Sequence, residues 1–302
     1  MRTLTVKGIR IDDTFAEAFG MRATALIITA DSARWARQAA TTMTGFATSV
    51  IGCGCEAGID RALTARETPD GRPGVRVLLF AMSTTELQKQ LSARVAQCVL
   101  TSPGSACYGG LAGEEDLRLG NALRYFGDGW QIAKRIAGKR YWRIPVMEGE
   151  FLCEATTGST ADAVGGGNLL LMGHTRRTAL AAAETAVKAM AQVAGTILPF
   201  PGGIVRSGSK VGSRYQGLIA STNDAYCPTL KGLPHSALDA DVGSVFEIVI
   251  DGLTSDAVRQ AMLVGLEAAA ALGPEAGPVR ISAGNYGGKL GRFHYHLKEL
   301  LG

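Results

Sequence analysis

Residues 75–80 (VRVLLF), followed by Thr84-Thr85-Glu86, are matched later in the chain by residues 245–250 (VFEIVI), followed by Thr254-Ser255-Asp256. Each apolar run has the length of a buried strand, and each leads into hydroxyl and acidic residues that favour the start of a helix. The correspondence holds at one offset for Thr84/Thr254, Thr85/Ser255, Glu86/Asp256, Lys89/Arg259 and Gln90/Gln260. The chain is therefore predicted to contain one structural unit twice.

A second pair of segments extends this repeat upstream. Residues 25–32 (ALIITADS) precede one predicted helix, with Ser32 as its cap, and residues 168–175 (NLLLMGHT) precede another. Before these, residues 8–11 correspond to residues 149–152. We expect helices over 33–43, from Thr84 or Thr85 through Val99, over 178–193 and over 255–272.

Each half reads as strand, helix and strand, repeated once, which is the split βαβ pattern of a ferredoxin-like lobe. We therefore predict an α+β fold with two ferredoxin-like lobes from an internal duplication, residues 1–143 and residues 144–302. The alternative is that βαβ-like patterns are common and that the repeat arises by chance. Where the two halves differ in a polar residue, function is a candidate explanation.

The composition excludes several classes of protein. The 302 residues include 39 glycines, about 13% against an average near 7%. The net charge of +4 and the lack of a basic block argue against nucleic-acid binding. We expect neither a secretory leader nor a membrane span, and hence a cytoplasmic protein with reduced cysteines. A charged fraction of only 19% fits a surface partly covered by other subunits.

Glu247 is the first polar difference between the halves, because the earlier copy has Val77 at that place. Strand alternation puts Glu247 on the face of Val245 and Val249, opposite Phe246 and Ile248. If that face is buried, loss of water raises the pKa of the carboxyl and suits it to proton transfer near neutrality. The alternative is a glutamate on the solvent face of a half-buried sheet.

The second and third polar differences between the two halves are glycine-rich loops in the later half. Residues 199–213 and 221–228 combine glycines and hydroxyls that allow backbone N–H groups to approach a ligand, although a plain surface turn is the alternative. Residues 282–291 follow a strand and add Asn285 and Lys289, which are donors suited to an amide or a carboxylate.

Metal and covalent-nucleophile motifs are missing from the sequence. Cys53 and Cys55 form a C-x-C pair, but no second pair of Cys or His with zinc spacing follows. The segment around Ser207 lacks the G-x-S-x-G pattern, and no Ser-His-Asp order is readable. We therefore predict no metal site and no covalent serine or cysteine chemistry.

Several uninterrupted blocks carry a resemblance to a known family. The chain closely resembles the formylmethanofuran:tetrahydromethanopterin formyltransferases, in blocks at residues 12–19, 56–60, 67–74, 126–129, 148–151, 199–213, 221–229 and 281–291. The resemblance implies a homotetramer of two-lobed subunits, with formyl-tetrahydromethanopterin and a methanofuran-type amine as substrates and no metal or prosthetic group. With its net charge of +4, the chain resembles the bacterial members of the family. This resemblance implies a role in formaldehyde oxidation within a formyltransferase/hydrolase complex.

Formyl transfer requires a proton relay, a donor to the oxyanion and exclusion of water. We predict Glu247 as the relay and Asn223, Tyr226 and Asn285 as polarising or orienting donors. The predicted substrate-binding residues, whose two lysines would meet the anionic tails of the carriers, are Gly202, Gly203, Ser207, Ser209, Lys210, Ser221, Thr222, Asp224, Gly287, Gly288 and Lys289.

Two other functions stay open at this point. One is a non-catalytic scaffold subunit that holds a pterin for a partner enzyme. The other is hydrolysis of the formyl donor, for which no metal-ligand set is visible in the sequence.

Overall fold

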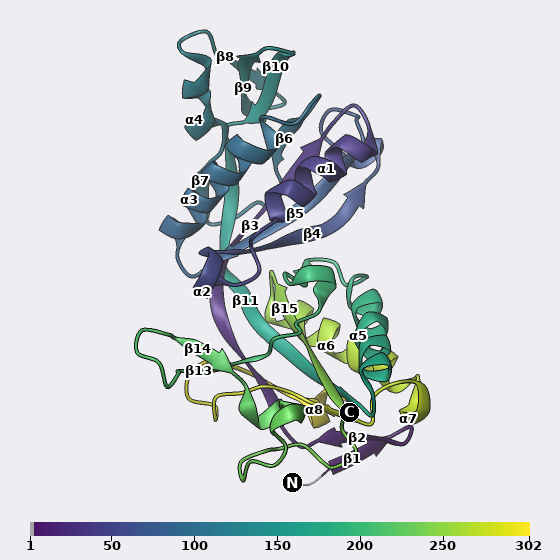
Figure 1. Ribbon diagram of the computed structural model, residues 1–302. Helices are drawn as coiled ribbons and strands as arrows, with labels where there is room; N and C mark the ends of the chain where they lie inside the picture. Colours follow the sequence, from purple (N-terminus) through teal and green to yellow (C-terminus); the bar gives the residue numbers. More distant parts are fainter. Residues whose placement is uncertain (1–2) are drawn as a thin grey trace.

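Two long strands, β3 (Phe15–Thr29) and β11 (Thr156–Gly173), run through the whole molecule. The computed structural model describes residues 3–302, and Figure 1 shows these strands crossing the waist between an upper and a lower lobe. The strands pair antiparallel at the waist, where Thr24 is opposite Ser159 and Phe19 is opposite Gly165. We call the upper lobe (residues 21–162) the amino-terminal lobe and the lower lobe (residues 3–20 and 163–302) the carboxy-terminal lobe.

The amino-terminal lobe contains a sheet covered on one face by helices. Its strands follow the order β4 (Glu56–Leu63), β5 (Gly74–Ala81), β3 and β6 (Ala106–Gly109). Helices α1 (Ala33–Thr44) and α3 (Thr84–Arg94) pack against this sheet. The other α-helices and strands of the lobe are α2 (Val50–Cys53), β7 (Glu115–Arg118), α4 (Gly120–Leu123), β8 (Ile132–Ile136), β9 (Lys139–Val146) and β10 (Gly149–Glu154).

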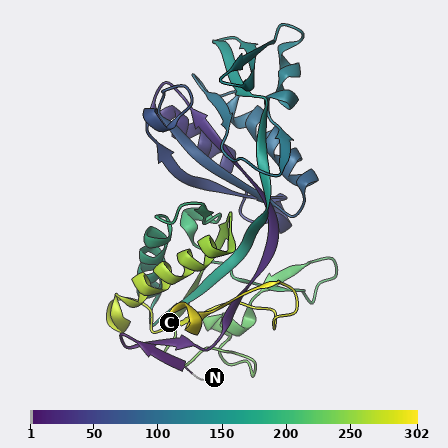
Figure 2. The same cartoon turned by 180° about the vertical axis from the view of Figure 1, so that it is seen from behind.

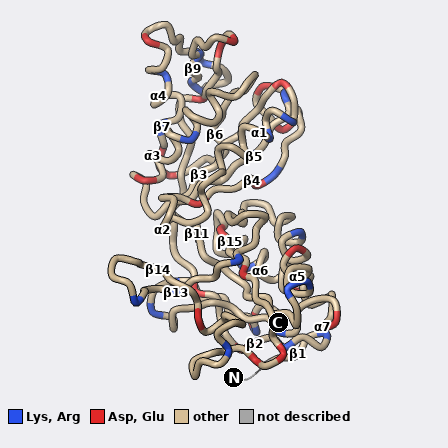
Figure 3. Tube along the Cα trace, viewed as in Figure 1, with Lys and Arg blue, Asp and Glu red and all other residues tan. Residues whose placement is uncertain are grey.

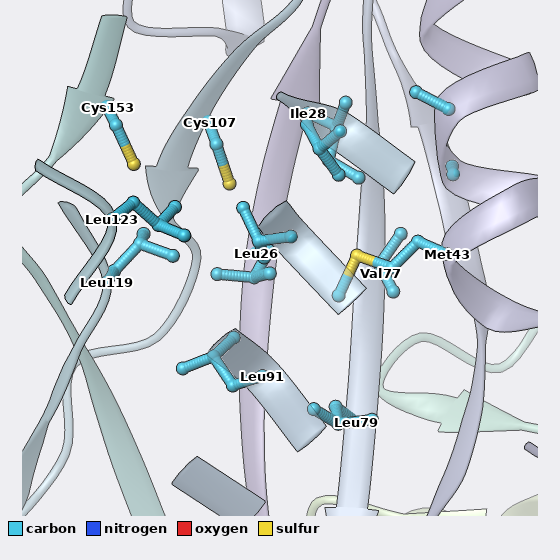
Figure 4. Close-up of a cluster of buried hydrophobic side chains, with 14 of the residues drawn as sticks. Leu26, Ile28, Met43, Val77, Leu79, Leu91, Cys107, Leu119, Leu123 and Cys153 are labelled. Atoms are coloured by element: carbon cyan, nitrogen blue, oxygen red, sulfur yellow. The ribbon is translucent and has the colours of Figure 1, made fainter. Parts of the chain in front are cut away.

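The period-two pattern of β3 explains where the core of this lobe lies. Leu26 and Ile28 point into the core under α1 and α3, whereas Ala23 and Ala25 belong to a second cluster on the opposite face. Figure 4 shows the main cluster, in which side chains of α3, of the strands and of the α4 segment meet: Leu26, Ile28, Val77, Leu79, Leu91, Leu119, Leu123, Cys107 and Cys153.

The carboxy-terminal lobe repeats this arrangement. Its strands follow the order β12 (Thr196–Ile197), β15 (Ser244–Gly252), β11, β16 (Arg280–Ser282), β2 (Ile9–Asp12) and β1 (Thr3–Val6). Helices α5 (Arg176–Met190) and α6 (Ser255–Ala270) cover one face. The other α-helices and strands are α7 (Gly273–Ala276), β17 (Phe293–His296), α8 (Leu297–Leu300) and a separate hairpin of β13 (Ser209–Val211) and β14 (Ala220–Thr222).

Each lobe contains one strand that comes just before a long strand in the chain. β2 precedes β3 and pairs in parallel with β16 in the carboxy-terminal lobe. β10 precedes β11 and pairs in parallel with β6 in the amino-terminal lobe. Both long strands are visible from behind in Figure 2, and the described part of the chain begins and ends in the lower lobe. The structure confirms the α+β class and the two lobes. The boundary between residues 143 and 144 stays a prediction; it falls inside β9, and residues 3–20 lie with the carboxy-terminal lobe.

The helix starts show how well local signals predict boundaries. Ser32 caps α1 as predicted, because its side chain accepts a hydrogen bond from the Trp35 N–H at 3.3 Å. The prediction for α3 was wrong by one or two residues, since Ser83 accepts from the Glu86 N–H at 3.2 Å and leaves Thr84 inside the first turn. Thr254 caps α6. The cap of α6 therefore corresponds to Ser83 in the structure, one residue before its sequence match Thr84.

Helix α5 also begins earlier than predicted. Thr175 caps it and exchanges hydrogen bonds with Thr178, so residues 176–178 form the first turn instead of a linker. Basic and acidic residues are interspersed along the chain in both lobes (Figure 3). Within residues 3–302, no helix is both long and apolar enough to cross a bilayer.

Candidate functional site

The site lies on the face of the carboxy-terminal sheet that the helices leave uncovered. Leu171 and Ile248 belong to the core beneath α5 and α6. Alternation then directs Leu170 and Glu247 to the opposite face, as predicted for Glu247. Leu170 is opposite Glu247 on β15 and opposite Ser282 on β16, so these three side chains share one level of this face. Residues 198–243, between β12 and β15, supply the loops that border it.

Glu247 is half-buried in a small cavity of about 80 Å³. Its backbone is fixed by two hydrogen bonds with Val205, from the Val205 N–H at 2.7 Å and to the Val205 carbonyl at 3.1 Å. Burial raises the pKa of Glu247 to about 7. The carboxyl group therefore changes charge in the range where a proton relay works best.

Three of the polar residues predicted from the sequence line the same cavity. Ser207 comes from the loop before β13, Asn223 follows β14, and Tyr226 lies in the short turn after it. The Tyr226 N–H donates to the Asn223 carbonyl at 3.1 Å, which holds the two side chains on one turn. The structure thus places hydroxyl and amide donors beside Glu247, although their catalytic roles stay predictions.

Lys210 is paired within the chain. Its Nζ donates to both carboxylate oxygens of Asp224 at 2.7 Å, and His235 Nε2 lies 3.2 Å from the same carboxylate. The hydrogen bond from Lys210 lowers the pKa of Asp224 against a smaller effect of desolvation, and His235 adds to the lowering. An anionic substrate tail would therefore compete with Asp224 for this lysine.

The other predicted residues of the hairpin lie near this ion pair. Ser221 is opposite Lys210 in the β13–β14 pairing and donates its hydroxyl to the Gly212 carbonyl at 2.7 Å. Ser209 and Thr222 are opposite each other and exposed. These residues are available to a ligand at the surface of the hairpin and do not line the Glu247 cavity.

A larger groove of about 780 Å³ adjoins the Glu247 cavity and shares Val205, Arg206 and Ser207 with it. Leu180 of α5 and Phe246 of β15 give it apolar walls. The groove has the size of a ligand pocket, whereas the cavity at Glu247 has room only for a small group. The predicted Gly202 lines this groove, whereas the predicted Gly203 is buried and is not part of the lining.

The remaining predicted residues lie on the loop between β16 and β17. The Asn285 amide nitrogen donates to the Thr14 hydroxyl at 3.1 Å and to the Phe15 carbonyl at 3.2 Å, so it ties the loop to the start of β3. Gly287 and Lys289 are exposed, and Gly288 is half-buried.

Sequence reasoning missed Glu17 in β3, which is buried and accepts hydrogen bonds from the backbone of this loop. The available signal was an acidic residue among the apolar residues at the start of this strand. It also missed Tyr286, whose pKa is raised by burial first and then by the charges of Glu247 and Glu17. Among residues 3–302, no three His, Cys, Asp or Glu side chains gather in a way that could hold a metal ion.

Comparison with known proteins places the whole chain in one family. A family model described as formylmethanofuran-tetrahydromethanopterin formyltransferase matches residues 4–146, and a model described as its proximal lobe matches residues 149–300. The chain is 60% identical to the formylmethanofuran–tetrahydromethanopterin formyltransferase of Methylococcus capsulatus, covering 99% of this chain and 100% of that protein. It is 58% identical to a subunit of the formyltransferase/hydrolase complex of Methylorubrum extorquens, covering 100% and 98%.

A solved structure agrees with these matches. A chain in the crystal structure of the formyltransferase/hydrolase complex from Methylorubrum extorquens, in complex with methylofuran, superposes with a TM-score of 0.98. It is 57% identical, and the match covers 100% of this chain and 99% of that one.

Proposed function

The chain belongs to the formylmethanofuran-tetrahydromethanopterin formyltransferase family, and we propose that it transfers a formyl group between N5 of tetrahydromethanopterin and the amine of a methanofuran-type carrier. The observation that carries this proposal is Glu247. A carboxyl group with a pKa of about 7 lies in a small cavity beside Asn223 and Tyr226, next to a groove large enough for a carrier.

The chemistry follows from these groups. The incoming amine attacks the formyl carbon, and the carbonyl oxygen gains negative charge in a tetrahedral intermediate. Glu247 in its ionised form takes the proton from the incoming nitrogen, and in its protonated form returns a proton to the departing nitrogen. The Asn223 amide and the Tyr226 hydroxyl supply donors that can stabilise the oxyanion, and we keep Asn285 as a further orienting donor.

The groove and the small cavity have different roles, one in binding and the other in chemistry. The small cavity accommodates the formyl group, and the apolar groove beside it would hold a ring of the carrier and keep water from the reacting carbon. We propose direct transfer with both carriers bound as substrates and with no metal or prosthetic group. Full activity after dialysis against a chelator is the expected result.

We also propose that the protein assembles as a homotetramer and works in the cytoplasm with hydrolase-complex subunits. The Methylorubrum extorquens relative is named as a subunit of such a complex. The exposed apolar side chains of the β13–β14 hairpin support contact with another protein surface: Val211, Tyr215, Leu218 and Ile219.

The fold carries one further proposal, an internal duplication of a ferredoxin-like unit. The order β4-β5-β3-β6 in one lobe matches the order β12-β15-β11-β16 in the other, with two helices on one face in each case. This supports the split βαβ pattern in both lobes.

Activity of the isolated chain tests the proposed function. The purified protein is mixed with formyl-tetrahydromethanopterin and methanofuran, and the pterin absorbance is followed. Transfer without any partner supports the enzyme. Tight binding without turnover would instead favour the scaffold, and formate release without an amine acceptor would favour hydrolysis.

A further inference from the structure

The loop between β16 and β17 is fastened from inside by a single carboxylate. Glu17 is 1% exposed, and its two oxygens accept hydrogen bonds from four backbone N–H groups of the loop. The donors are Tyr286 at 2.6 Å, Gly288 at 2.8 Å, Leu290 at 2.7 Å and Gly291 at 2.7 Å. Burial by itself would raise the pKa of Glu17, but these four bonds outweigh it and lower the pKa to about 2. The group is therefore ionised at neutral pH.

The glycines of the loop fit this carboxylate. Gly287 and Gly288 have φ angles of +74° and +71°, which allow the chain to turn so that its N–H groups converge on one point. A Cβ atom at Gly291 would lie 2.9 Å from Glu17 Cγ and 2.5 Å from the Ala18 carbonyl oxygen. The convergent N–H groups that would otherwise suit an external anion are thus occupied by the chain itself.

The fastened loop starts on the sheet face that carries Glu247, and its residues lie outside the lining of the Glu247 cavity. It leaves β16 after Ser282, which shares a level of the sheet with Glu247 on the two sides of Leu170. The Tyr286 ring packs against Phe19 with 5.9 Å between ring centroids. Its hydroxyl also lies within electrostatic reach of Glu247 and Glu17, whose charges add to the effect of burial on the pKa of Tyr286. The residue that Glu17 holds by its backbone is therefore also a neighbour of the relay.

We propose that Glu17 is a positioning residue for formyl transfer, which holds Tyr286 and its loop beside the sheet face that carries Glu247; this inference rests on the proposed function. Without the charge at residue 17, the four N–H groups lose their common acceptor and the loop moves away from the sheet. More water then reaches the face that carries Glu247, and the carboxyl group no longer has the protonation behaviour that the relay needs.

The test substitution is Glu17→Gln, which keeps the shape but turns an NH2 group toward two of the four donors. We expect kcat to fall about 10- to 100-fold, as for a misplaced reacting group. We also expect the inflection near pH 7 in kcat/KM to move to lower pH, because added water lowers the pKa of Glu247 toward its ordinary value. The titratable groups that face Glu247 are Arg206, Tyr226, Cys227 and Tyr286, and the substitution leaves all four in place. Wild-type kcat and an unchanged pH profile would overturn the proposal.

Glu154→Gln is the matched control in the other lobe. Glu154 is also a buried carboxylate that accepts a backbone hydrogen bond, from the Gly109 N–H at 3.0 Å, and it pairs with Lys139. The Glu154→Gln substitution should lower the melting temperature without changing kcat or the pH profile. Equal kinetic effects in both variants would mean that stability, and not position, explains the loss.

A second variant covers the case in which Glu17→Gln does not fold. Gly288→Ala strains the loop at a positive φ while the core stays untouched, and it should reproduce the loss of kcat and the pH shift. If the wild type is active and the variant that folds has the same kinetics, only this inference is overturned. An inactive wild type overturns the proposed function, and this inference falls with it.

Discussion

Glu56 of the amino-terminal lobe and Asp251 of the carboxy-terminal lobe form a pair of buried carboxyl groups at the waist of the molecule. Asp251 Oδ1 accepts from the Gly166 N–H at 3.1 Å, and Glu56 Oε1 accepts from the Val50 N–H at 3.0 Å. Within the described part of the chain, Asp251 Oδ2 meets no N–H or O–H donor. Burial and the neighbouring Glu56 raise the pKa of Asp251 well above its ordinary range, which favours the protonated form of Asp251.

This pair predicts a pH-dependent stability that Asp251→Asn removes. The folded protein keeps a proton at Asp251 that the unfolded chain releases near pH 4, so the free energy of unfolding of the wild type falls as the pH rises above about 4. The amide can accept from Gly166 and donate to Glu56 at every pH. The melting temperature of Asp251→Asn minus that of the wild type should therefore be larger at pH 8 than at pH 5. The exposed Asp162→Asn should show the same difference from wild type at both pH values. If Asp251→Asn also differed from wild type by the same amount at pH 5 and pH 8, the retained proton at Asp251 would be contradicted.

The relay prediction concerns Glu247→Gln. Because the amide cannot ionise, we expect kcat to fall by about 100-fold or more, as for the loss of a general base. The rise of wild-type kcat/KM with pH through about 7 should also disappear, since that step follows the ionisation of Glu247. Stopped-flow pterin absorbance across pH 5.5–8.5 measures both effects, with the exposed Glu267→Gln of α6 as a control. Retained turnover in the folded variant would remove Glu247 from the mechanism.

How much of this site the sequence predicts depends on whether the signal is local. The faces of β15 follow from alternation within nine residues, and so the sequence places Glu247 correctly opposite Ile248. The path of β3 through both lobes depends on partners far along the chain, and no periodicity inside a strand reveals which lobe covers each end. Glu17 illustrates the same limit, because its four donors lie about 270 residues away in sequence.

The hairpin ion pair gives two substitutions with opposite effects on substrate affinity. If Lys210 meets an anionic carrier tail, Lys210→Met should raise KM and leave kcat nearly unchanged. Asp224→Asn removes the competing carboxylate at 2.7 Å and should lower KM. Initial rates at low ionic strength show the effect best, because exposed charges are screened by salt. Lys188→Met on α5 is the control for a lost surface charge. Changes of the same sign in both hairpin variants would mean that the ion pair only shapes the hairpin.

The β13–β14 hairpin predicts how the subunits associate. It forms a two-stranded sheet of its own, and such hairpins are only marginally stable in water without a partner. Ile219 is 63% exposed and Tyr215 is 76% exposed, while Figure 2 shows the hairpin projecting from the carboxy-terminal lobe. Burial of these side chains against another subunit would stabilise both the hairpin and the assembly. We therefore expect Ile219→Lys to shift the sedimentation coefficient toward smaller species, whereas Gln216→Lys in the same hairpin adds equal charge and leaves it unchanged. An unaltered sedimentation coefficient for Ile219→Lys would place the subunit contact elsewhere on the surface.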